Sequence, residues 1–270
     1  MAGFFGFFDY TKPGPGVPKE QPKKAGIVVF FEVFARKFWN LIKVNLIFNV
    51  FNLLTLFFLF IAVQFLFPSQ LFEDFELDFI LRFSIGSVFV TMPILTTGPV
   101  QAGMTYILRN YSREEHAFIW WDFKEHALKN LKQSLIICAI DFFAVIIMGI
   151  SLNFYGAMAS SSIMYTAALG ILILVLILFF MMHLFIYPMM VTFKLTVKQI
   201  YKNAMIFSII KFLPNLGILA LCAVLTLVTF INPLIGIFLF VFITNSLIGL
   251  IINFYANPVL SKYMIKDEET

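Results

Sequence analysis

The chain has 270 residues, of which 61% are hydrophobic and 13% are charged, and it carries a formal net charge of +4 at pH 7. Soluble domains average about 45–50% apolar and about 25% charged residues, so this composition excludes a soluble globular protein. A positive net charge can indicate nucleic-acid binding, but here the basic residues follow a membrane pattern. The sequence therefore predicts an integral membrane protein.

Residues 1–31 are predicted to form a flexible cytoplasmic arm. The stretch DYTKPGPGVPKEQPKKAG, residues 9–26, is rich in Pro, Gly and Lys, and such a composition cannot bury a core. Its lysines would be attracted to anionic lipid. The first apolar run ends in FLFPSQ, residues 65–70, without a small-residue cleavage site, which indicates an uncleaved anchor rather than a signal peptide.

Six segments are long and apolar enough to cross a bilayer core, which requires about 20 residues of helix. They cover residues 44–67, 79–97, 134–155, 163–191, 212–231 and 233–256. Asn232 and Pro233 separate the last two, and Pro fits the first turn of a helix but cannot continue the preceding one. The sequence thus predicts an all-α membrane protein with a single six-span domain over residues 32–262, arranged as three hairpins, and a cytoplasmic tail over 263–270.

The basic residues lie on one side of these predicted spans. With the exception of Arg82, every Lys and Arg precedes the first span, follows the last, or lies between the second and third or the fourth and fifth. Loops on the cytoplasmic side carry the excess of Lys and Arg, so both termini are predicted to be cytoplasmic. The three tryptophans, Trp39, Trp120 and Trp121, fall at the same predicted interface.

A basic amphipathic helix is predicted at the cytoplasmic interface before each hairpin. The three stretches are FFEVFARKFWNLIK, REEHAFIWWDFKEHALKNLKQSL and FKLTVKQIYKNAMIF. In the second, apolar side chains recur at helical spacing, while Asp122 with His126 and Glu125 with Lys129 form i,i+4 pairs on the wet side. We expect anionic inner-leaflet lipid or a partner protein to bind a surface that comprises Arg113, Trp120, Trp121, Lys124, Lys129, Lys132, Lys194, Lys198 and Lys202.

Several motifs resemble the YesL-like family of bacterial membrane proteins, a family of unknown function that is common in Firmicutes. They are DYTKPGPGV, FFEVFARKFWNLIKVN and TTGPVQAGMTYILRNYSREEHAFIWWDFKEHALKNLKQSL. The family usually has Gly-Pro-Ala-Thr-Ala-Gly after the second span, and here Val100 and Gln101 replace the middle residues. The resemblance implies a bacterial plasma membrane protein associated with carbohydrate uptake systems or two-component regulators. It implies no catalytic residues.

A layer of polar residues is predicted inside the membrane. Asp141 and His183 lie about 10 Å and about 12 Å from the cytoplasmic ends of adjacent antiparallel spans, and therefore at the same depth. Asn45, Asn49 and Asn52 share one helix face, and Asn245 lies somewhat deeper in the last span. Two interpretations stay open: hydrogen bonds that hold the helices together, or a cytoplasm-facing cavity that binds a ligand or relays a proton.

The sequence shows no phosphate-binding glycine loop, nucleophile elbow, metal-ligand spacing or cofactor motif. His116 and His126 would lie on different faces of a helix, so we expect neither to bind metal. The TTGP stretch, residues 96–99, reads as the end of span two or, alternatively, as the break in a discontinuous substrate-binding helix. The sequence predicts a non-catalytic accessory or regulatory membrane protein; the alternative is a small transporter or channel that uses the polar layer.

Overall fold

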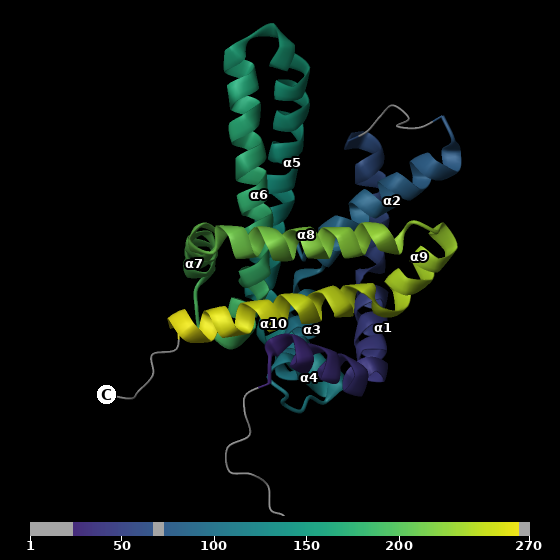
Figure 1. The fold of residues 1–270 in the computed structure, drawn as a ribbon, viewed down its shortest axis with the longest axis vertical. Coiled ribbons are helices and arrows are strands. Elements are labelled where there is room, and N and C mark those ends of the chain that lie inside the picture. The colour runs from purple at the N-terminus through teal and green to yellow at the C-terminus, as the bar shows by residue number, and fades with distance from the viewer. Residues whose placement is uncertain (1–23, 67–72, 265–270) are drawn as a thin grey trace, which may run out of the picture.

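The computed structural model describes residues 24–66 and 73–264, and these ranges are helical almost throughout (Figure 1). The longer elements are α1 (Gly26–Leu66), α2 (Phe75–Thr91), α3 (Gly98–Ser112), α4 (Ile119–Lys129), α5 (Leu131–Met158), α6 (Ile163–Thr192), α7 (Val197–Ile210), α8 (Phe212–Thr229) and α10 (Asn245–Met264). Short elements complete the series: η1 (Ala159–Ser161), α9 (Pro233–Leu239) and the π-helix η2 (Phe240–Thr244).

Several helices have the length and composition of membrane spans, in agreement with the predicted class. Five segments of the described chain qualify: Gly26–Leu59, Leu131–Ser161, Ile163–Thr192, Phe212–Thr229 and Ile235–Met264. Helix α2 has 17 residues and is not among them. The all-α membrane class is thus supported, while the count of six spans and their arrangement as three hairpins stay predictions.

The apolar helices do not form one parallel bundle. Helices α5 and α6 pack against each other and project from the rest of the molecule, whereas α8 and α10 run crosswise to them (Figure 1). The tip of the α5–α6 pair lies at one end, and α4 with the first part of α1 lies at the other. Apolar side chains on the outer faces of α5 and α8, such as Phe143 and Leu213, are exposed. These faces suit contact with lipid.

A short polar helix, α3, occupies the centre of the molecule. It contacts α1, α4, α5, α6 and α10, and most of its side chains are buried, including Gln101, Thr105 and Asn110. A Cβ atom at Gly103 would lie 2.6 Å from the carbonyl oxygen of Phe123. Only glycine permits this backbone approach, so Gly103 is the reason that α4 can lie directly against α3.

A break in the helical chain separates α2 from α3. The predicted span over 79–97 is wrong at its C-terminal end, because α2 ends at Thr91 and residues 92–97 are non-helical. Pro93 disfavours helical conformation at Met92 before it, and the segment then turns so that the backbone N–H groups of Ile94 and Leu95 both donate to the carbonyl of Phe89. Irregular backbone at membrane depth is tolerated only where protein covers it, and Met92, Ile94 and Thr96 are buried.

Several predicted boundaries also need correction. Residues 1–23 and 265–270 of the predicted arm and tail lie outside the described residues, but α1 begins at Gly26, so the arm does not extend to residue 31. The interface helix expected before the first span is continuous with that span in α1. The helix expected over 113–135 is interrupted at Asn130, between α4 and α5. The last predicted span is divided into α9, η2 and α10 and continues to Met264.

Gly98 offers a test of the packing at this break. A Cβ atom there would lie 2.7 Å from the carbonyl carbon of Ser134 in α5. Because this contact is with backbone, a helix would have to shift to relieve it. We expect Gly98→Ala to lower the free energy of unfolding in detergent micelles by about 1–3 kcal/mol, as overpacking does. The control is Gly170→Ala in α6, where nothing lies within 4 Å and the change should be neutral or stabilising. Equal stability of the Gly98 variant and the wild type would contradict the tight contact.

Candidate functional site

The structure brings Asp141 of α5 and His183 of α6, which the sequence places at equal depth, into contact. The His183 Nε2 atom lies 3.1 Å from Asp141 Oδ2, and the two side chains are 1% and 0% exposed. The two atoms are close enough for an ion pair, but they are not aligned for a hydrogen bond. The contact is therefore electrostatic in character, and each atom keeps hydrogen-bonding capacity that no described residue uses.

The other ring nitrogen of His183 has a backbone partner. His183 Nδ1 lies 2.8 Å from the carbonyl oxygen of Phe179, and because a carbonyl can only accept, Nδ1 carries a hydrogen and donates. A further proton can be placed either on Nε2, where it faces an Asp141 carboxylate, or on the carboxyl group, where it faces a neutral ring. Both forms have zero net charge, which limits the cost of burying two ionisable groups away from water.

Tyr201 of α7 completes the site, and sequence reasoning missed it. Its Oη donates to Asp141 Oδ1 over 2.6 Å. Burial, and then the negative charge of Asp141, raise the pKa of Tyr201 far above its ordinary value, so the phenol stays protonated and continues to donate. The only sequence signal is that Tyr201 adjoins the buried face of α7, formed by Ile200, Ala204 and Phe207. We call Asp141, His183 and Tyr201 the Asp141 cluster.

The break between α2 and α3 borders this cluster. Cys138, which precedes Asp141 by three residues in α5, donates through Sγ to the carbonyl oxygen of Thr96 over 3.2 Å. The hydroxyl groups of Tyr187 and Thr96 approach each other, but neither forms a hydrogen bond of good geometry. The site is thus a buried group of polar side chains from α5, α6, α7 and the irregular segment.

The asparagines of the predicted polar layer lie away from the Asp141 cluster, and several of them form hydrogen bonds with η2. Asn49 and its neighbour Asn45 each donate through Nδ2 to the carbonyl oxygens of Phe240 and Val241 in η2. Asn245 donates to Asn49 Oδ1 over 3.0 Å. A π-helix shifts the usual backbone bonding and leaves carbonyl groups for other donors, and the amides of α1 supply them. Asn45, Asn49 and Asn245 therefore stabilise the helix irregularity in the last span.

Asn52 holds the start of α3. Its Oδ1 atom accepts from the backbone N–H of Thr97 over 2.6 Å, and its Nδ2 donates to the carbonyl of Phe48 in its own helix. One of the first backbone donors before α3 is satisfied in this way. The single predicted layer is thus divided: the asparagines bond the irregular backbone segments, and Asp141 and His183 belong to the separate Asp141 cluster. For the asparagines, the hydrogen bonds favour the structural interpretation.

On the predicted interface surface, most of the basic and aromatic side chains are exposed. Arg113 is half-buried, and the exposed members are Trp120, Trp121, Lys124, Lys129, Lys132, Lys194, Lys198 and Lys202. The predicted wet-side pair of Asp122 with His126 is wrong. His126 is buried and stacks on Tyr106 of α3 with 3.3 Å between ring centroids, and Asp122 accepts from the backbone N–H of Phe118 instead. The flat ring of Tyr106 provides a face on which the imidazole buries its apolar surface.

The stacked position has an electrostatic consequence. Burial, and then the positive charge of Lys129, lower the pKa of His126 below its ordinary value. The ring is therefore neutral at pH 7, and α4 is attached to α3 by packing rather than by charge.

No family model, no curated protein and no solved structure matches this chain. Membership of the YesL-like family accordingly stays a prediction. In residues 24–66 and 73–264, no group of three or more His, Cys, Asp and Glu side chains could hold a metal ion. The chemistry available at the Asp141 cluster is that of holding or exchanging one proton.

A mutational cycle tests the Asp141 cluster. Asp141→Asn should retain the fold, because an amide can donate to His183 and accept from Tyr201 without a charge to bury. Asp141→Leu leaves both partners unsatisfied, and we expect a loss of about 1–3 kcal/mol for each buried group. Adding His183→Leu should recover part of that loss, with a coupling energy of about 0.5–3 kcal/mol in detergent unfolding.

The matched control for this cycle is Phe142→Leu, at a half-exposed position next to Asp141, which should change stability little. If the losses of the Asp141→Leu and His183→Leu variants simply add, the two side chains do not interact and the cluster is wrongly described.

Proposed function

We propose that the protein is a non-catalytic accessory or regulatory membrane protein that presents α4 and α7 to a partner protein. The proposal rests on the way in which α4 packs against α3. One face of this helix is fixed on α3 through Phe123 and His126, while Trp121, Lys124 and Lys129 on other sides are exposed. A rigidly held helix with outward aromatic and basic side chains has the composition of a docking surface at a membrane interface.

Helix α7 supports a regulatory form of this role. Its exposed lysines, Lys198 and Lys202, share the helix with Tyr201, whose hydroxyl group binds Asp141 inside the molecule. A partner that displaces α7 would remove the hydrogen bond to Asp141 and change the polarity around the buried pair. Surface docking and the Asp141 cluster are thereby linked through one helix.

The resemblance to YesL-like proteins supports a narrower version of the proposal. In that version the partner is a carbohydrate uptake transporter or its sensor kinase in the bacterial plasma membrane. Anionic inner-leaflet lipid would help to orient the basic surface, at about 1 kcal/mol for each Lys or Arg near the membrane.

The proposal requires that both termini, α4 and α7 lie on the cytoplasmic side of the membrane. The one-sided distribution of basic residues supports this topology. Reporter fusions after Lys124, Lys198 and Thr270 should report a cytoplasmic location, and fusions after Ser161 and Asn232 an external one. A single reversed reporter among the cytoplasmic three would overturn the topology.

Purification from native membranes tests the partner. We expect a transporter or kinase subunit, identified by mass spectrometry, to co-elute with the wild-type protein. Lys124→Glu combined with Lys129→Glu should reduce its recovery about tenfold or more, because reversed charges at an interface oppose binding.

The matched control reverses two basic residues outside α4 and α7, Lys24→Glu with Lys262→Glu, and should leave the recovery of the partner unchanged. Repeated isolation of the wild type as a lone oligomer, or equal recovery with both double variants, would count against an accessory role.

One observation favours a second function, a small transporter or channel. Asp141 Oδ2 and His183 Nε2 are buried without aligned hydrogen-bond partners, and buried ionisable groups of this kind occur in proton pathways. Because these side chains are closed to water, transport would require a second conformation. Proton flux in vesicles that contain the wild-type protein, abolished by Asp141→Asn, would support this alternative; no flux would exclude proton transport by the cluster.

A further inference from the structure

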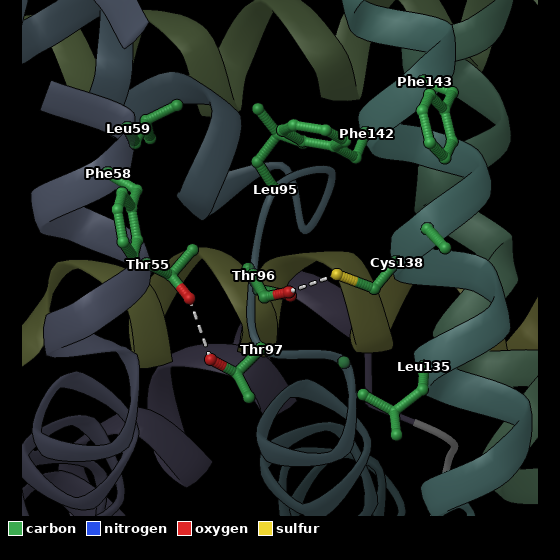
Figure 2. Close-up of a pocket in the computed structure, with 12 residues that line it drawn as sticks. Thr55, Phe58, Leu59, Leu95, Thr96, Thr97, Leu135, Cys138, Phe142 and Phe143 are labelled. Carbon is green, nitrogen blue, oxygen red and sulfur yellow. Dashed lines mark hydrogen bonds between the residues drawn. The ribbon is translucent and has the colours of Figure 1, made fainter. Parts of the chain in front are cut away.

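A pocket of about 410 Å³ lies between α1, α5 and the break at residues 92–97 (Figure 2). Most of its wall is apolar, with Phe58 and Leu59 from α1, Leu95 from the break, and Phe142 and Phe143 from α5. This volume lies within the usual range for small-molecule sites, about 300–1,000 Å³. The proposed docking surface on α4 and α7 plays no part in this pocket.

Exposed aromatic side chains surround the mouth of the pocket. Phe58, Phe142 and Phe143 are half or more exposed, and they belong to α1 and α5, which both contain candidate membrane spans. If these helices span the membrane, an occupant would enter from the hydrocarbon region. No charged side chain is among the described residues that line the space, so an ionised headgroup would find no partner here.

A few polar groups lie on the inner side of the otherwise apolar pocket. Figure 2 shows the hydroxyl groups of Thr55 and Thr97 joined by a hydrogen bond of 2.9 Å, and Cys138 bonded to the carbonyl of Thr96. Each hydroxyl oxygen has two lone pairs, so this pair can accept a further hydrogen bond. The site thus combines a long apolar wall with a small uncharged group of acceptors.

We propose that this pocket binds a neutral, single-chain amphiphile, such as a long-chain alcohol or a fatty acid in its protonated form. The chain lies against the phenylalanines, and its hydroxyl group donates to the Thr55–Thr97 pair. A plain hydrocarbon leaves the acceptors unused, and a phospholipid would have to bring its charged headgroup to an uncharged wall. This site is independent of the proposed accessory function.

The test uses the full-length protein in phosphatidylcholine vesicles and a hexadecanol analogue that carries a photoreactive diazirine. We expect labelling of residues that line the pocket, mapped by mass spectrometry. Hexadecanol should compete with the probe, while hexadecane and phosphatidylglycerol should compete much less. Equal competition by hexadecane would overturn the requirement for a hydroxyl group, and equal competition by phosphatidylglycerol would overturn the selection against charged lipid.

Two variants with matched controls separate the site from general lipid contact. Ala139→Phe fills the pocket and should abolish labelling, whereas Ala167→Phe, at an exposed position of α6, should not. Thr55→Val should weaken competition by hexadecanol about 2- to 10-fold, the effect of one neutral hydrogen bond. Its control is Thr226→Val, which removes one member of the other threonine pair, Thr91 with Thr226.

Elution profile and thermal unfolding check that each variant is folded. If Ala139→Phe fails to fold, the comparison of Thr55→Val with Thr226→Val decides the question. Labelling that survives in folded Ala139→Phe, or equal behaviour of the two threonine variants, would overturn the proposal.

Discussion

The structure depends on one constraint: backbone polar groups in apolar surroundings must find hydrogen-bond partners within the protein. Regular helices meet this requirement by themselves, but the chain departs from the α-helix at residues 92–97 and again at η2. Both irregular segments lie against α1. The side chains of Asn45 and Asn49 bond the carbonyl groups of η2, and Asn52 accepts from Thr97. A single helix face therefore makes both departures possible.

The break before α3 determines the rest of the architecture. It allows a short polar helix to lie in the centre of the molecule, where an uninterrupted span would have carried the chain outward. Close contacts then fix α3: Gly98 lies against the backbone of Ser134, Gly103 lies against Phe123, and the Cδ1 atom of Leu108 fills the space beside Gly249. These contacts position α4, and they create the pocket between α1 and α5. The surface and the pocket are consequences of the same irregular segment.

The Asp141 cluster connects the interior with the surface. Asp141 and His183 lie in contact in a closed site, and Tyr201 links them to a helix that carries exposed lysines. Burial of this pair costs free energy that apolar side chains of the same size would not cost. Such a cost is typical of sites where polar groups serve specificity or function rather than stability alone. The regulatory form of the accessory proposal and the transport alternative have one requirement in common: the cluster must respond to a change in its surroundings.

The sequence by itself determined the membrane class, the approximate limits of the long apolar helices and the equal depth of Asp141 and His183. Composition and the length of apolar runs indicate which helices suit lipid, and residue counting gives the depth of two residues, whereas the structure shows that these two face each other. It also showed that Asn45, Asn49 and Asn52 share a face, but periodicity identifies a face and not the element opposite it. Only the tertiary structure decided that this face meets η2 and the break.

The tertiary structure also decided the contacts between segments that are far apart in the sequence. Helix α3 is polar, and its sequence is typical of an interfacial segment; its burial depends on five other helices. The sequence pattern predicts that His126 faces solvent, but in the structure it stacks on Tyr106. Tyr201 reaches Asp141 across 60 residues of sequence, and the crosswise course of α8 and α10 depends on how side chains pack between helices. Hydrophobic periodicity reports which side of a helix is buried, whereas the identity and angle of its neighbours follow from packing among distant segments.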